Sequence, residues 1–193
     1  MKKMGFLFDA RRCNGCRACA VACKEQHNTP DGVWLRRVKE TPDQMVWFSQ
    51  SCNHCEKPAC FAVCPVKAYS IEPDGLVVQN HSKCIGCQAC IAACPFKAPV
   101  FDGKSKKVFK CDGCVQLLAQ GKRPACVQAC TQGALQFGPI EELRKKYPEA
   151  VVAGFEWAAK NFGYASCGWC SAWCSSFHLT NWVRNSTKAP RVF

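Results

Sequence analysis

The stretch Cys84-Ile-Gly-Cys87-Gln-Ala-Cys90-Ile-Ala-Ala-Cys94-Pro95 determines how the rest of the chain is interpreted. Its spacing is C-x2-C-x2-C-x3-C-P. This spacing allows three thiolates to hold one [4Fe–4S] cluster while the fourth thiolate reaches a second cluster. The remainder of the sequence contains further copies of this stretch and the segments that connect them.

Three other cysteine runs resemble this stretch. They are Cys13, Cys16, Cys19 and Cys23; Cys52, Cys55, Cys60 and Cys64; and Cys111, Cys114, Cys126 and Cys130. The second run in the chain has four residues in its middle gap, and the last run has eleven. Four runs of four supply sixteen ligands, which are enough for four cubane clusters.

The number of cysteines leaves two classes of protein open. The chain has 193 residues, of which 19 are cysteine, as in a disulfide scaffold or a metal protein. Repeated C-x2-C-x2-C runs direct neighbouring sulfurs to one centre, whereas disulfides need pairs in matched geometry. Zinc sites favour paired C-x2-C knuckles. The spacing therefore favours iron–sulfur clusters, and a zinc-binding regulatory protein is the remote alternative.

The net charge does not indicate a nucleic-acid-binding protein. The formal charge is +12, but each ligated cluster adds about −2, so four clusters leave about +4. No nucleic-acid-binding motif accompanies the basic residues. The sequence also lacks a dinucleotide-binding glycine loop, a P-loop and an H-E-x-x-H motif. We therefore expect a non-catalytic protein that transfers electrons.

The four runs are expected to form pairs, because the fourth cysteine of each run ligates the partner's cluster. The middle two runs both end in Cys-Pro, and the first and last runs both lack this proline. The predicted ligand sets are Cys13, Cys16, Cys19 and Cys130; Cys111, Cys114, Cys126 and Cys23; Cys52, Cys55, Cys60 and Cys94; and Cys84, Cys87, Cys90 and Cys64.

This pairing predicts an α+β fold with two nested ferredoxin-like modules, short hairpins and short helices. Residues 1–50 and 98–140 would form the outer module, residues 51–97 the inner module, and residues 141–193 a C-terminal helix and an irregular tail rich in Cys and Trp. The residue patterns predict one strand at 5–8 and hairpins at 33–48, 69–79 and 100–109. They predict helices at 115–119 and 140–147, with Pro139 at the first helical position.

The histidines have two interpretations. His27, His54 and His81 are expected to be surface or loop residues. His54 lies between Cys52 and Cys55, so the alternative is that it donates a hydrogen bond to cluster sulfur.

Several segments resemble the iron–sulfur subunit of dimethyl sulfoxide reductase. They are the four runs in their order, Ser51-Cys52-Asn53-His54-Cys55-Glu56, Lys110-Cys111-Asp112-Gly113-Cys114, and residues 137–146. The resemblance covers residues 5–148 and implies four [4Fe–4S] clusters in an anaerobic respiratory complex. It implies electron transfer between a membrane anchor that oxidises quinol and a molybdopterin-containing catalytic subunit, with the inner module towards the anchor. A polyferredoxin-type carrier for a hydrogenase or formate dehydrogenase is the alternative.

The last forty residues do not follow this family pattern. They contain Cys167, Cys170, Cys174 and His178 in the spacing C-x2-C-x3-C-x3-H. These residues are expected either to be free thiols in a tail that faces a partner or to form a separate Cys3His metal site.

The sequence also bears on the location of the protein. It contains no apolar stretch of 18 residues and no signal-peptide pattern. We expect no direct membrane span and a place in a complex on the cytoplasmic or periplasmic face of the inner membrane. The resemblance leaves the side of the membrane open.

Overall fold

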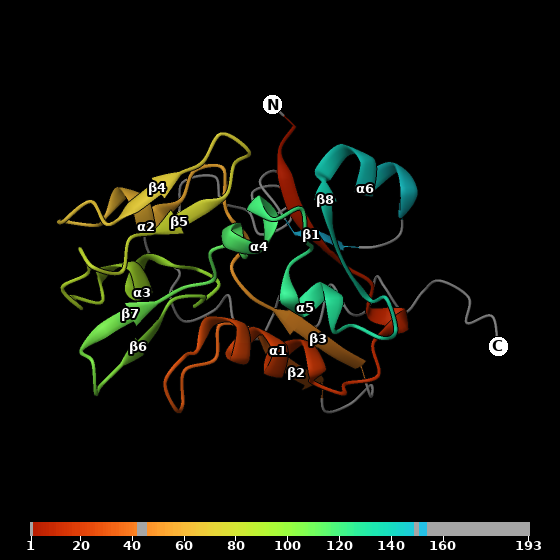
Figure 1. Ribbon diagram of the computed structural model, residues 1–193, viewed down its shortest axis with the longest axis horizontal. Helices are drawn as coiled ribbons and strands as arrows, with labels where there is room; N and C mark the ends of the chain where they lie inside the picture. Colours follow the sequence, from red (N-terminus) through yellow and green to blue (C-terminus); the bar gives the residue numbers. More distant parts are fainter. Residues whose placement is uncertain (1, 42–45, 149–150, 154–193) are drawn as a thin grey trace.

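The computed structural model of the protein describes residues 2–41, 46–148 and 151–153 (Figure 1). The described chain combines short strands with short helices, as expected for a small α+β fold. Along the long axis of the molecule, two hairpins lie at one end, and a three-stranded sheet with its covering helix lies towards the other.

The three-stranded sheet brings the beginning of the chain next to residues that follow the last cysteine run. Its central strand β1 (Met4–Phe8) pairs antiparallel with β8 (Leu135–Pro139) and with β9 (Val151–Ala153). Phe6 lies opposite Phe137 in the register. The helix α6 (Ile140–Lys146) covers this sheet by packing Ile140 and Leu143 against Leu7. The sequence predicted β1 and α6 but neither β8 nor β9.

Three antiparallel hairpins carry the segments between the cysteine runs. They are β2 (Arg37–Thr41) with β3 (Val46–Gln50), β4 (Tyr69–Ile71) with β5 (Val77–Gln79), and β6 (Val100–Asp102) with β7 (Lys107–Phe109). The last two lie where the sequence predicted them.

The first hairpin begins later than predicted, because residues 33–36 are not part of the strand. The Val33 N–H donates to the Pro30 carbonyl at 3.0 Å, and the Thr29 hydroxyl donates to the Val33 carbonyl at 2.9 Å. These turn bonds remove Val33 from a strand ladder. Its side chain and that of Leu35 are nevertheless buried, which explains why the apolar pattern suggested a strand.

The helices pair in a way that joins distant cysteine runs. A 3-10 helix η1 (Ala10–Arg12) precedes α1 (Ala18–His27), and α1 packs against α5 (Ala125–Gln128). The helix α2 (Ala59–Ala62) packs against α3 (Ala89–Ala93). The helix α4 (Val115–Ala119) lies where it was predicted, whereas Pro139 caps α6 and is not its first residue. None of the described helices has the length and apolar character of a membrane span.

Cysteine side chains form a large part of the core. One buried cluster combines Phe6, Phe8 and Leu135 with cysteines from the first, second and last runs. Another combines Tyr69, Val77 and Val108 with Cys60 and Cys90. The space that these cysteines surround therefore lies within the packed interior.

Three of the four C-x-x-C turns have a glycine before the second cysteine. Gly15, Gly86 and Gly113 all adopt left-handed backbone angles, with φ of 74°, 71° and 77°. A Cβ atom on Gly86 would lie 2.0 Å from the carbonyl oxygen of Lys106. Only glycine fits both this angle and this approach without strain.

We predict that Gly86→Ala lowers the free energy of unfolding by at least about 2 kcal/mol, because it adds a left-handed alanine and a backbone clash. Denaturant unfolding of the holo-protein, followed by the visible absorbance, measures this change. Gly103→Ala is the matched control, because a Cβ there meets no atom within 4 Å and the residue has no positive φ. Equal stability of the two variants would contradict the prediction.

Candidate metal centres

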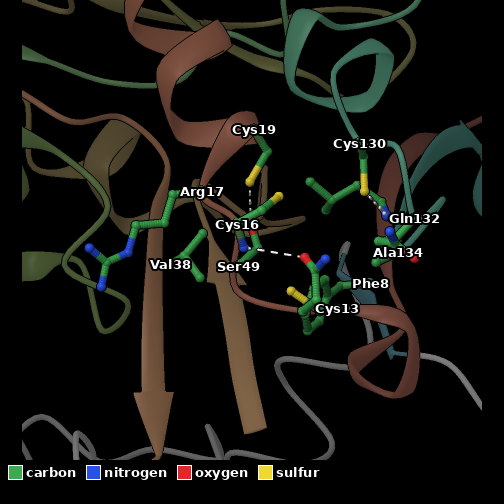
Figure 2. Close-up of a pocket in the computed structure, with 12 residues that line it drawn as sticks. Phe8, Cys13, Cys16, Arg17, Cys19, Val38, Ser49, Cys130, Gln132 and Ala134 are labelled. Carbon is green, nitrogen blue, oxygen red and sulfur yellow. Dashed lines mark hydrogen bonds between the residues drawn. The ribbon is translucent and has the colours of Figure 1, made fainter.

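Four cysteines surround a cavity beside the start of α1 (Figure 2). Cys13, Cys16 and Cys19 come from the loop before α1 and from its first turn, and Cys130 follows α5. The Ser49 hydroxyl from β3 lies 3.4 Å from the Cys19 sulfur. Residues from the first and the last cysteine runs therefore share one cavity.

Two further cavities lie in the part of the molecule that contains the second and third runs. Their cysteines are Cys52, Cys55, Cys60 and Cys94 in one, and Cys84, Cys87, Cys90 and Cys64 in the other. In each cavity, three cysteines come from one run and one cysteine comes from the other.

The remaining four described cysteines lie together in the interior. Cys23, Cys111, Cys114 and Cys126 are each at most 5% exposed. Burial, followed by the charges of nearby cysteines such as Cys126 and Cys114, raises the pKa of the Cys23 thiol to about 12. Burial, followed by the charge of Cys23, also raises the pKa of the Cys111 thiol. Each of the four groups thus holds the four cysteines that the sequence analysis assigned together, and their ligation of one cluster each remains a prediction.

The cysteines are suited to hold a multiply charged metal cluster. The sixteen described cysteines are all free thiols, and no disulfide joins any of them. Burial, followed by the charges of neighbouring cysteines of the same group, also raises the pKa of Cys55 and of Cys60 to about 12. Thiols in this state keep their protons at neutral pH unless a bound metal replaces them. Converging free thiols that form no disulfide therefore fit iron–sulfur clusters.

The four groups differ in their distance from solvent. Cys16 in the first cavity and Cys87 in the cavity of the third run are exposed. The group of Cys23 and Cys111 is buried throughout. Two groups therefore reach the surface, and at least one lies inside the molecule.

Two buried cations lie among the cysteine groups. Arg36 is 2% exposed and donates to the Ser49 hydroxyl at 3.0 Å and to the Ser51 hydroxyl at 2.8 Å. Lys110 is 6% exposed and lines the cavity of Cys52. Burial acts to lower the pKa of each, but nearby cysteines, first Cys126 for Arg36 and Cys52 for Lys110, raise it overall.

Sequence reasoning assigned no role to either cation. Lys110 precedes Cys111 directly, and this adjacency is a signal that could have been used. Arg36 has no local signal, because its hydroxyl partners come from the following strand and loop.

His54 is a loop residue, as expected, but it is not at the surface. It is 1% exposed and has a left-handed φ of 46°. It occupies the position before the second cysteine that glycine holds in the other three C-x-x-C turns. A left-handed residue other than glycine costs about 1–3 kcal/mol and needs surrounding contacts to hold it.

His27 lies next to another cysteine group. Its Nε2 atom is 3.3 Å from the Cys114 sulfur and 3.6 Å from the Asp112 carboxylate. The ligand atoms of these three residues all lie within 4.8 Å of one another. Because Cys114 belongs to the buried cysteine group, His27 and Asp112 are part of the surroundings of that group.

The sequence also predicted a possible separate metal site in the C-terminal tail. Cys167, Cys170, Cys174 and His178 lie outside the described residues.

The sequence matches known iron–sulfur proteins over most of its length. Residues 43–140 match the 4Fe-4S dicluster domain family. The chain is 44% identical over 164 residues to the B subunit of anaerobic dimethyl sulfoxide reductase from Escherichia coli, covering 77% of this chain and 80% of that protein. It is 40% identical over 161 residues to the B subunit of polysulfide reductase from Wolinella succinogenes, covering 79% and 84%. It is 39% identical over 145 residues to the thiosulfate reductase electron transfer subunit of Salmonella typhi, covering 70% and 76%.

These matches agree with the converging thiols and with the resemblance drawn from the cysteine runs. The cofactors of the chain are four [4Fe–4S] clusters, and the sixteen described cysteines fit them. The chain therefore belongs to the 4Fe-4S dicluster family, among the iron–sulfur electron-transfer subunits related to the B subunit of anaerobic dimethyl sulfoxide reductase.

Proposed function

We propose that the chain relays electrons between a quinol-oxidising membrane anchor and a molybdopterin catalytic subunit of an anaerobic respiratory complex. The observation that carries this proposal is the arrangement of four cysteine groups, with an exposed cysteine in two of them. Each group holds one cluster, with the ligand sets Cys13, Cys16, Cys19 and Cys130; Cys23, Cys111, Cys114 and Cys126; Cys52, Cys55, Cys60 and Cys94; and Cys64, Cys84, Cys87 and Cys90. A [4Fe–4S] cluster accepts and donates single electrons.

The proposal includes two nested modules. The inner module contains the groups of Cys52 and Cys84, and the outer module contains the groups of Cys13 and Cys111. The packing of α2 on α3, and of α1 on α5, supports these pairs.

Within each module, the helices support a short path for electrons between the two cysteine groups. Cys19 and Cys23 both lie on α1 and belong to different groups. Four residues of helix advance about 6 Å, so one helix connects neighbouring groups over a short span. Beyond α2 and α3, Cys64 and Cys94 cross between the two inner groups.

The two ends of the proposed electron path are the cysteine groups that reach the surface, those of Cys87 and Cys16, and both are suited to meet partners. Ile85 is 62% exposed and lines the cavity of Cys87, and Phe61 and Val63 are 45% and 40% exposed near Cys64. At the other end, Val21 on α1 is 51% exposed. Exposed apolar side chains around an accessible cysteine favour a fixed protein partner over a freely diffusing carrier. By the family resemblance, the Ile85 end would face the membrane anchor.

We predict that Cys60→Ser and Cys94→Ser perturb the same one of four clusters, because both belong to one ligand set. EPR spectra of the reduced protein, with iron analysis, measure the effect, and iron should fall from about sixteen to about twelve per chain if a cluster is lost. Cys90→Ser is the comparison, because Cys90 belongs to the neighbouring set. If Cys94→Ser altered the signal that Cys90→Ser alters, the proposed crossing of fourth ligands would be wrong.

We predict that Ile85→Asp removes the membrane anchor and quinol-linked electron transfer but leaves the catalytic subunit bound. A carboxylate at this exposed position disrupts an apolar contact and has little effect on the fold. Affinity purification of the tagged chain from anaerobic cells, with molybdenum analysis and identification of co-purified subunits, measures this result.

Lys104→Asp, on the exposed β6–β7 turn, is the control and should leave both partners bound. Purification of the wild-type chain without any molybdenum subunit would contradict the proposed function and favour a polyferredoxin-type carrier.

A further inference from the structure

The Lys110 ammonium lies between cysteines of two different groups. Its Nζ atom donates to the Val77 carbonyl and to the Cys111 carbonyl, each at 2.6 Å, and to the Cys52 sulfur at 3.6 Å. Three acceptors match the three hydrogens of an ammonium group. The geometry therefore fixes a positive charge beside Cys52, while its backbone partner Cys111 belongs to the other group.

His54 contacts the same two cysteines. Its backbone N–H donates to the Cys52 sulfur at 3.4 Å, and its Nε2 atom lies 3.8 Å from the Cys111 sulfur. The Val77 N–H donates to His54 Nδ1 at 3.0 Å. Because Nδ1 accepts this bond, it carries no proton, so Nε2 is the protonated nitrogen and donates to Cys111.

The backbone at His54 has a left-handed conformation that glycine would adopt more easily than histidine. Glycine at the equivalent position of the other three turns adopts the left-handed conformation without strain. A glycine at this position would keep the backbone bond to Cys52 but would lose both ring contacts. The strained residue therefore supplies a donor to Cys111 that glycine cannot supply.

We propose that Lys110 and His54 form a polar junction between the inner and outer modules and set the reduction potentials of the two clusters that meet there. This inference rests on the ligand sets of the proposed function, in which Cys52 belongs to the inner module and Cys111 to the outer one. Both are positioning residues, because they act through cysteine ligands.

The direction of the effect follows from charge. A [4Fe–4S] cluster with four thiolates gains one negative charge on reduction, so a nearby cation stabilises the reduced form. Hydrogen bonds to cysteine sulfur act in the same direction. Water is excluded at Lys110 and His54, which are 6% and 1% exposed, so screening is weak. Arg36 is the other buried cation in this region, and its nearest bonds run to Ser49 and Ser51 instead.

The first test is Lys110→Met, which keeps an unbranched side chain and removes the charge. Redox titration of the holo-protein, followed by EPR, measures the midpoint potentials of the clusters. We expect two of the four to become more negative, each by about tenfold in the reduction equilibrium, or about 59 mV for a one-electron couple. Lys104→Met removes an exposed charge and should shift none. Four unchanged potentials, or an equal shift of all four, would overturn the proposal.

The second test is His54→Asn, which remains informative if Lys110→Met fails to assemble its clusters. Asparagine tolerates a left-handed backbone, and its side-chain oxygen can accept the Val77 N–H in place of Nδ1. The variant therefore loses only the donor to Cys111. We expect it to lower a single midpoint potential, and that potential should be one of the two that Lys110→Met lowers. No shift, or a shift in a cluster that Lys110→Met leaves unchanged, would overturn the junction.

These readouts are independent of the partners. Absence of the anchor or catalytic subunit from the preparation would count against the proposed function. The two shifted potentials in Lys110→Met and the single one in His54→Asn would still decide whether the junction exists, because they are measured on the chain itself.

Discussion

The convergence of four cysteine side chains at each of four points is the constraint on which the rest of the structure depends. Short helices, left-handed turns and small hairpins are the elements that can bring sulfurs from separate runs to one centre. The pairing of β1 with β8 has the same effect over a longer range, because it brings the first run beside the last. Much of the core is therefore organised around space for cofactors instead of around continuous apolar packing.

The interior must also contain positive charge, and this requirement follows from the clusters that the cysteines would hold. Each ligated cluster brings negative charge into an interior where unpaired charge is costly. Lys110 and Arg36 supply positive charge there, and both are held by hydrogen bonds to groups from other segments. The basic composition of the chain is in part a consequence of this need. The buried cations therefore connect the composition of the sequence with the electron-transfer chemistry of the fold.

The sequence predicted the features that depend on local spacing and missed those that depend on distant contacts. The hairpins at β4–β5 and β6–β7 follow from β-rich runs around turn residues. The helix α6 follows from acidic residues in its first turn and basic residues in its last, which suit the helix dipole. The strand β8 was missed because Leu135–Pro139 ends in Gly-Pro, which is typical of a turn, and only its pairing with β1 makes it a strand. The division of the sixteen cysteines into four groups could be predicted from the spacing and order of the runs. The burial of His54 could not, because its partners Val77 and Cys111 lie far along the chain.

Four [4Fe–4S] clusters on the four cysteine runs would set the metal content of this chain. The decisive measurement is the amount of iron, acid-labile sulfide and zinc per chain in anaerobically purified protein. Four clusters give about sixteen irons and about sixteen sulfides per chain, with negligible zinc. About eight irons, which would leave two of the four cysteine groups without a cluster, or zinc in place of iron would contradict the presence of four clusters.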